Sequence, residues 1–181
     1  MAKVPKLKPE YTKAKASKIV KDHGFKLDKC FLIGIRGYYK KTMGNPLAND
    51  IGIYDDALMV ISPEYYATFN ANTDPSVQRY GMANMVPGVY DYKIGIHNIS
   101  KPANRRYKAL VQAGEVTVDR YDKGLDTGWF GINIHKGSYN TTSSLGCQTI
   151  YPDQWNSFLA NVEFQMKKHD QKTIKYILIS F

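Results

Sequence analysis

The sequence predicts a mainly β fold with peripheral helices, arranged as a β-sandwich or barrel in a single domain. Two observations predict it. The chain has 181 residues, of which 43% are hydrophobic and 23% charged, and this length and composition are typical of one globular domain that buries a core. Short segments rich in aliphatic and aromatic residues recur between clusters of Gly, Pro and Asn, a pattern typical of all-β sandwiches and barrels.

The chain begins with a predicted helix and a predicted buried strand. Residues 11–22 carry alanine, lysine and isoleucine at helical spacing, and Gly24 can supply the left-handed residue that ends a helix. Residues 29–36 are rich in phenylalanine, leucine and isoleucine and are followed by Gly37. This segment therefore predicts a strand in the core.

A long loop, a second strand and a short helix are expected next. Residues 40–56 contain Gly, Pro and Asn at several positions and predict a loop. Residues 57–61 predict another buried strand. Ser62 and Pro63 match the N-cap and the first residue of a helix, so a short helix is predicted over residues 62–69.

The second half of the chain is predicted to be mostly strands. Turn-forming clusters separate its apolar runs, which predicts strands at 88–97, 107–112, 115–121, 129–135, 147–151 and 173–180. Residues 152–168 predict a helix, because Pro152 suits its first turn and apolar side chains recur on one face.

Most of the net positive charge lies near the N-terminus. Residues 1–29 hold nine lysines and only three acidic residues, and the whole chain carries a formal net charge of +9. A flexible, lysine-rich segment favours anionic surfaces such as a cell envelope without selecting one of them. The sequence has no zinc-finger spacing, RNP-like strand or phosphate-binding GxxxxGK[ST] loop, so no specific nucleic-acid partner is expected.

Neither a transmembrane segment nor a secretory signal is expected. The longest apolar runs are far shorter than the roughly 20 residues that cross a bilayer. The basic N-terminus lacks the apolar stretch and the small-residue cleavage site of a signal peptide. Cys30 and Cys147 are the only cysteines and permit at most one disulfide, so one of them is a candidate for chemistry.

His135 and Cys147 form the candidate catalytic pair. One predicted strand ends at His135, and the next begins at Cys147, twelve residues later. A thiol becomes a good nucleophile at neutral pH when a neighbouring imidazole accepts its proton. Two adjacent antiparallel strands joined by a loop would place the two groups within hydrogen-bond reach. The alternative is that both are ordinary buried residues at strand ends.

The residues just before Cys147 suit a catalytic loop. Gly146 lets a backbone N–H approach a reacting carbonyl closely, as an oxyanion hole requires. Ser144 can hold the loop in place by hydrogen bonding.

His135 and the Ser144-x-Gly146-Cys147 element resemble the signature of L,D-transpeptidase catalytic domains, which have the YkuD-type fold. The resemblance implies that the Cys147 thiolate attacks a peptidoglycan stem peptide and that His135 is its base. It also implies that amides around Gly146 and Cys147 hold the oxyanion, that Ser144 shapes the loop, and that no cofactor or metal takes part. Residues 29–181 would then form the L,D-transpeptidase-like catalytic domain, and residues 1–28 a basic N-terminal segment with a short helix.

Two positions depart from the family pattern. Leu145 stands where a polar or basic residue is common, and Thr149 stands where the family commonly has an arginine. Recognition of a substrate carboxylate must then come from other residues. The candidates for substrate contacts are His97, Gln148, Lys136, Trp129, Arg105 and Arg106.

Further stretches resemble a group of phage and prophage-encoded proteins that carry the same Ser-x-Gly-Cys-Gln-Thr element. These stretches are residues 34–39, 52–56 and 69–75. This resemblance implies an endolysin-like lysis enzyme, so cleavage of stem peptides is favoured over cross-linking. Such a protein would be made in the cytoplasm without a signal peptide and would act on the cell wall after release by another route.

Other functional classes have less support. A zinc site of His97, His135 and Cys147 lacks the close paired spacing of metal ligands. A muramidase needs a buried glutamate near a second carboxylate, and none of the four glutamates has a suitable context. Papain-like and NlpC-type peptidases place cysteine before histidine, the reverse of the order here. The remaining alternative is a non-enzymatic cell-wall-binding or virion structural module.

Overall fold

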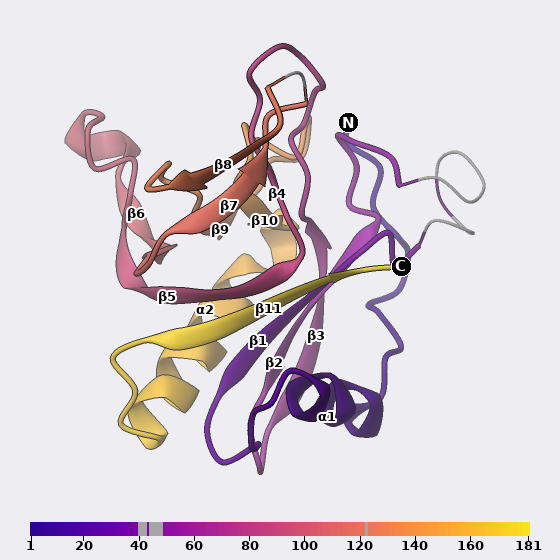
Figure 1. Ribbon diagram of the computed structural model, residues 1–181, viewed down its shortest axis with the longest axis vertical. Coiled ribbons are helices and arrows are strands. Elements are labelled where there is room, and N and C mark those ends of the chain that lie inside the picture. The colour runs from indigo at the N-terminus through magenta and orange to yellow at the C-terminus, as the bar shows by residue number, and fades with distance from the viewer. Residues whose placement is uncertain (40–42, 44–48, 122) are drawn as a thin grey trace.

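The computed structural model describes residues 1–39, 43, 49–121 and 123–181, and these residues fold around a closed barrel (Figure 1). The barrel strands, in order of pairing, are β1 (Phe31–Arg36), β11 (Ile174–Ser180), β5 (Gly88–His97), β6 (Tyr107–Gln112), β9 (Ile134–Lys136), β10 (Gln148–Ile150), β3 (Tyr66–Asn72) and β2 (Asp56–Ile61). The expectation of a mainly β fold is confirmed. The long loop predicted over 40–56 falls in part on residues outside this description.

The remaining elements lie outside the barrel. A three-stranded sheet is formed by β4 (Asn84–Met85), β7 (Val116–Asp119) and β8 (Leu125–Gly128). The helices α1 (Lys13–Asp22) and α2 (Pro152–Lys168) are peripheral, as predicted (Figure 1). Among the described residues, no helix is both long enough and apolar enough to cross a membrane.

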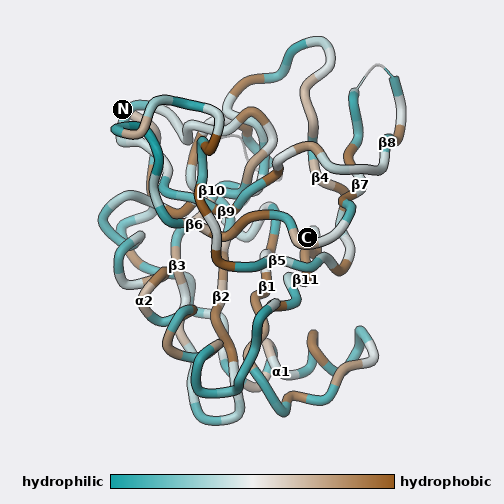
Figure 2. The backbone as a smooth tube through the Cα atoms, turned by 90° about the vertical axis from the view of Figure 1, so that its left-hand side faces the viewer, coloured by the Kyte–Doolittle hydropathy of each residue, from teal (hydrophilic) through white to brown (hydrophobic). Residues whose placement is uncertain are grey.

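The central strands bury side chains on both faces. All of β1 is buried, with Leu32 in the main hydrophobic cluster that includes α2 and with Phe31 and Ile33 in a second cluster that includes α1. Successive side chains of a strand point to opposite faces, so a strand covered on both sides reads as one continuous apolar run. Figure 2 shows this hydrophobic character along β1 and β2.

The N-terminal segment is packed against the barrel. The Ala2 N–H donates to the Tyr139 carbonyl at 2.9 Å, and the Tyr54 N–H donates to the Lys3 carbonyl at 2.9 Å. Further along, α1 buries Val20 in the second cluster. The expectation of a flexible basic end is therefore wrong for this segment.

The helix predicted over residues 62–69 is also wrong. Ser62 and Tyr65 close a tight turn, because the Ser62 N–H donates to the Tyr65 carbonyl at 2.9 Å and the Tyr65 N–H donates to the Ser62 hydroxyl at 3.1 Å. This turn joins β2 to β3, which pair from Ile61 and Tyr66 at the turn to Asp56 and Ala71. The cap-like Ser62-Pro63 pair thus opens a hairpin rather than a helix.

The strand predicted over residues 129–135 is shorter than expected. Only β9 (Ile134–Lys136) pairs in the barrel, and Gly131 upstream of it has a φ of +70°. The strand β8 was not predicted, because its four residues are largely exposed and carry no apolar alternation.

Candidate active site

Two short parallel strands carry the candidate catalytic pair. His135 lies in β9 opposite Thr149 of β10, and Cys147 immediately precedes β10. The prediction of antiparallel strands is wrong, because the segment 137–147 brings the chain back to the starting end of β9 before β10 begins. His135 and Cys147 nevertheless line the same cleft, which has a volume of about 1010 Å³.

The environment of His135 determines which ring nitrogen can act as a base. The side chain is only 3% exposed, and its Nδ1 lies 2.7 Å from the Lys136 carbonyl oxygen. A carbonyl only accepts hydrogen bonds, so the proton lies on Nδ1 and Nε2 carries the free lone pair. The Tyr107 hydroxyl lies 3.1 Å from the same Nδ1 and helps to fix the ring.

The Cys147 thiol is half-buried and bound at both sides. Its Sγ accepts from the Asn133 backbone N–H at 3.4 Å, and its S–H donates to the Gly131 carbonyl at 3.5 Å. Burial raises the pKa of the thiol to about 11, although the Asn133 N–H acts in the opposite direction. Burial, with a smaller effect of His97, lowers the pKa of His135 to about 4. At neutral pH the cleft therefore holds an uncharged thiol and an uncharged imidazole.

Ser144 organises the loop before the cysteine. Its hydroxyl donates to the Cys147 carbonyl at 2.6 Å and accepts from the Gly146 N–H at 3.0 Å. Ser76, which sequence reasoning missed, binds Ser144 twice through backbone and hydroxyl groups, at 2.8 and 2.7 Å. The loop is thus anchored to a segment far away in the sequence.

Gly146 has a structural role, but its amide is not free. Its φ is +136°, and a Cβ there would lie 2.5 Å from the Ala83 carbonyl oxygen, so only glycine fits. Its N–H already donates to the Ser144 hydroxyl. The expectation that the Gly146 amide holds an oxyanion is therefore wrong in this conformation, because the Ser144 hydroxyl occupies the donor.

A second histidine shares the cleft. His97, at the end of β5, stacks on His135 with ring centroids 4.0 Å apart and planes inclined by 20°. Its Nδ1 lies 3.0 Å from the side-chain amide nitrogen of Asn133. Asn133, also missed from the sequence, thus contacts both His97 and, through its backbone, Cys147.

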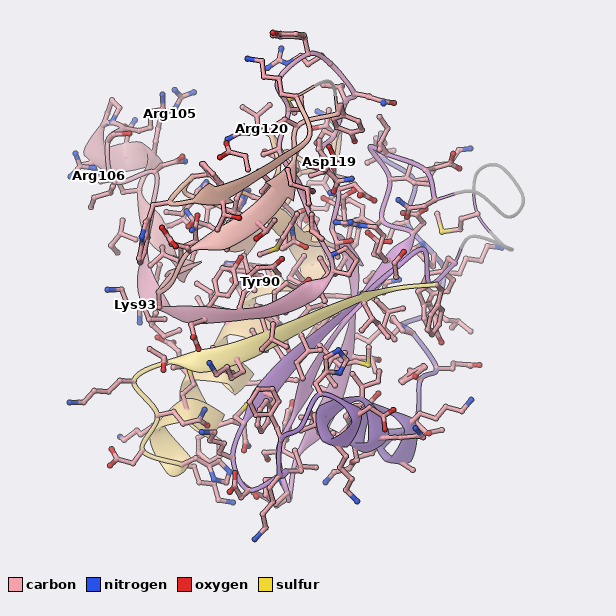
Figure 3. The ribbon with its side chains drawn as sticks, viewed as in Figure 1. Tyr90, Lys93, Arg105, Arg106, Asp119 and Arg120 are labelled. Carbon is pink, nitrogen blue, oxygen red and sulfur yellow. The ribbon has the colours of Figure 1, made fainter. Side chains whose placement is uncertain are left out.

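The expected substrate contacts divide into two groups. Arg105 and Lys136 line the cleft, and none of the described carboxylate side chains lines it with them. The neighbouring Arg106 does not line it, and its Nε donates to the Lys101 carbonyl at 2.6 Å. Figure 3 shows Arg105 and Arg106 projecting from the turn between β5 and β6, which contains the short 3₁₀ helix η1 (Ala103–Arg105).

Two residues expected to contact substrate do not line the cleft. Gln148 is fully buried, with its amide nitrogen 3.2 Å from the Gly146 carbonyl and its Oε1 accepting from the Tyr176 hydroxyl at 3.0 Å. Trp129 is 64% exposed and does not line the cleft, because the chain between β8 and β9 leaves the sheet there. The other cysteine, Cys30, is fully buried, and burial raises the pKa of its thiol to about 12.

Within the described part of the chain, no group of three or more His, Cys, Asp or Glu side chains is placed to hold a metal ion. The cleft is lined by the Cys147 thiol and the imidazoles of His97 and His135. In the comparisons with known proteins, no family model, curated protein or solved structure matches the chain.

Proposed function

We propose that the chain is a cysteine-dependent acyl-transfer enzyme that acts on peptidoglycan stem peptides, with hydrolysis favoured over transfer to an amine. One observation carries the proposal. Cys147 and His135 line the same cleft, and the Lys136 carbonyl holds the His135 ring with Nε2 as the available base. A nucleophile, a base and a group that orients the base are the parts that covalent acyl transfer requires.

The first half of the proposed reaction forms a thioester. The Cys147 sulfur attacks the acyl carbon, its proton moves to His135 Nε2, and the carbonyl electron pair moves onto oxygen. His135 then gives that proton to the leaving amine as the C–N bond breaks. Because thiol and imidazole are both uncharged at rest, the proton transfer accompanies the attack instead of preceding it.

The second half releases the acyl group. Water attacks the thioester while His135 accepts one of its protons, and the C–S bond breaks to give a carboxylic acid and the Cys147 thiol. An amine in place of water would give a new amide bond. The cleft is open to solvent through the exposed side chains of Lys136 and Leu145, which supports water as the acceptor.

Two features support a stem peptide as the substrate. The first is the resemblance of His135 and Ser144-x-Gly146-Cys147 to L,D-transpeptidases. The second is the charge of the cleft: Arg105 and Lys136 make no side-chain ion pair with any described residue, and no acidic side chain in the described part of the chain lines the cleft. We infer that these two cations hold a carboxylate of the peptide.

The basic N-terminal segment would contribute binding to the envelope. The lysines at positions 3, 6 and 8 are exposed, and the segment carries most of the positive charge. Because residues 1–28 are packed on the barrel, their contribution is best tested by replacing Lys3, Lys6 and Lys8 with glutamine. Envelope binding should then weaken in a salt-dependent way, with no change in turnover of a soluble muropeptide.

The second candidate function is a non-enzymatic wall-binding or virion structural module. One observation favours it, namely that burial raises the pKa of the Cys147 thiol to about 11, whereas reactive cysteines commonly have lowered values. In such a module the His135–Cys147 pair would be incidental.

An acylation experiment separates the two candidates. A carbapenem is a small acylating probe, and an enzyme should show an adduct in its intact mass that maps to Cys147. Cys147→Ala should remove the adduct and the release of fragments from peptidoglycan, whereas Cys30→Ala should retain both. A wild-type protein without an adduct or fragment release would support the structural module instead. Mass analysis of the fragments distinguishes new carboxyl groups from new cross-links.

A further inference from the structure

The loop before Cys147 leaves one amide free to stabilise a negatively charged acyl oxygen. The Gly146 N–H is bound to the Ser144 hydroxyl at 3.0 Å. The Cys147 N–H makes no hydrogen bond with any described residue. An oxyanion is normally stabilised by two or more preorganised hydrogen-bond donors. A second donor therefore has to come from another element that lines the cleft.

The hydrogen bonding of His97 leaves one donor on its ring. The side-chain amide nitrogen of Asn133 lies 3.0 Å from His97 Nδ1. An amide NH₂ only donates, so Nδ1 accepts and the proton of the neutral ring lies on Nε2. His97 Nε2 has no hydrogen-bond partner among the described residues, and the residue lines the cleft.

Three contacts hold His97 in a fixed orientation. Its ring stacks on His135 at 4.0 Å, and the Tyr107 ring lies 5.2 Å away on a neighbouring strand. Asn133 binds His97 through its side chain and Cys147 Sγ through its backbone N–H. Burial lowers the pKa of His97 from its ordinary value, so its ring is neutral at pH 7. A fixed, neutral N–H donor is what a preorganised oxyanion site requires.

We propose that His97 is a second catalytic histidine, whose Nε2–H and the Cys147 N–H together bind the oxygen of the substrate acyl group. This inference rests on the acyl-transfer function proposed above. As the Cys147 sulfur forms its bond to the acyl carbon, the carbonyl electron pair moves to that oxygen, and His97 stabilises the charge without giving up its proton. Asn133 acts as a positioning residue, because it selects the tautomer that donates into the cleft.

Two substitutions at His97 separate a donor from a packing residue. His97→Gln keeps an N–H donor on a side chain of similar reach but loses the aromatic stack. His97→Phe keeps an aromatic ring against His135 but loses the donor. If the ring serves only to pack, phenylalanine should be the milder change, and if it serves as a donor, glutamine should be the milder change.

The measurement compares two reactions of the same thiol. Acylation by a carbapenem develops an oxyanion, whereas alkylation by iodoacetamide displaces iodide from carbon and develops none. We expect His97→Phe to slow acylation about 100-fold or more while alkylation changes by less than about threefold, and His97→Gln to lose less than about tenfold in acylation. Thermal unfolding of each variant, and peptide mapping to Cys147, check that folded protein and the correct thiol are compared.

Each outcome decides between the hypotheses. Equal acylation by His97→Phe and wild type would overturn the donor role, as would parallel losses in acylation and alkylation, which indicate a displaced thiol. If wild-type Cys147 is alkylated but never acylated, the proposed enzymatic function itself fails. If wild type is acylated and only the order of the two His97 variants is reversed, acyl transfer stands and the assignment of His97 fails.

Discussion

At the scale of residues, the candidate site holds an uncharged pair rather than an ion pair. Burial acts on both partners, raising the pKa of the Cys147 thiol and lowering that of the His135 imidazole. Within residues 1–39, 43, 49–121 and 123–181, no carboxylate lines the cleft to stabilise an imidazolium. In the proposed reaction, the thiol proton would therefore have to move to His135 as the sulfur attacks, and not before the attack.

The pH dependence of acylation tests this arrangement. In the proposed mechanism neutral His135 is the base, and its pKa is lowered to about 4, so the rate should rise with pH through that value and reach a plateau before pH 6. His135→Gln should lose about 100-fold or more and should lack this acid limb, because glutamine cannot accept the proton. Carbapenem acylation rates from pH 3.5 to 8 provide the measurement. An acid limb centred at or above 6.5 would show instead that the imidazole is not held in a desolvated state.

Gly146 is expected to be required for reactivity more than for folding. A Cβ at this position would lie 2.5 Å from the Ala83 carbonyl, and the φ of +136° is strained for any other residue. Gly146→Ala should therefore shift the loop, lower acylation at least about tenfold and cost about 1–3 kcal/mol of unfolding free energy. Gly24→Ala is the matched control, because Gly24 also has a positive φ but no atom within 4 Å of a Cβ. Gly24→Ala should lose some stability but should acylate at the wild-type rate. Equal acylation rates in the two variants would contradict the role of Gly146.

The sequence predicted the residues of the site that share one motif and missed those that come from other segments. His135, Ser144, Gly146 and Cys147 are recognisable because they are close in the chain and chemically distinctive. Tyr107, Asn133 and Ser76 are common polar types, and only the folded barrel brings them to the cleft. Gln148 was expected to contact substrate because it adjoins the candidate nucleophile, yet in β10 its side chain points into the core.

At the scale of elements, prediction succeeded where local pattern and tertiary contacts agree. The bounds expected for β5, β6 and α2 match those observed. Residues 62–69 show the opposite case. A residue pair that suits a helix N-cap can also form a turn, and the pairing of this segment with β2 makes it the strand β3 instead of a helix. The relative direction of β9 and β10 depends on the path of the loop between them, which no periodicity encodes.

The turn between β5 and β6 provides a matched test of substrate charge. Arg105 lines the cleft, and the adjacent Arg106 does not. Arg105→Gln should raise KM for a stem peptide with a free carboxylate by about three- to tenfold, an effect expected for an exposed ionic contact, and should leave kcat and the KM for an amidated peptide unchanged. Arg106→Gln should change neither. Equal effects of the two variants would show that general surface charge, not a carboxylate contact in the cleft, attracts the peptide.

At the scale of the whole molecule, a buried polar cluster joins the barrel to the segment that binds the loop before Cys147. Arg36 at the end of β1 pairs with Asp74 at 2.9 Å and donates to the Thr73 carbonyl at 2.6 Å. Asp56 of β2 accepts from the Thr73 N–H at 2.6 Å. Ser76 lies two residues after Asp74 and binds Ser144, so the chain links this cluster to the loop that lines the cleft.

Carboxylates outnumber cations in this cluster, which gives folding a pH dependence. Asp55 is fully buried, and one of its oxygens has no hydrogen-bond partner among the described residues. Burial first, and then the nearby Asp74, raise the pKa of Asp55 to about 7. A group whose pKa is raised on folding binds its proton more tightly in the folded state, so its contribution to stability is present below the unfolded value and is lost as pH rises through the folded value.

Asp55→Asn should therefore remove part of the pH dependence of unfolding. Asparagine stays uncharged, so the variant should gain about 1–3 kcal/mol of unfolding free energy relative to wild type at pH 8 and much less at pH 4.5, where Asp55 is already protonated in the folded state. The effect of His135 on stability has the opposite sign, because its lowered pKa makes folding less favourable as pH falls from 6.5 towards 4. This effect is the same in both proteins, so it cancels in the difference between their unfolding free energies. Urea unfolding of the two proteins at several pH values between 4.5 and 8 measures that difference. A difference that does not grow with pH would mean that Asp55 is already ionised in the folded protein at the lower pH.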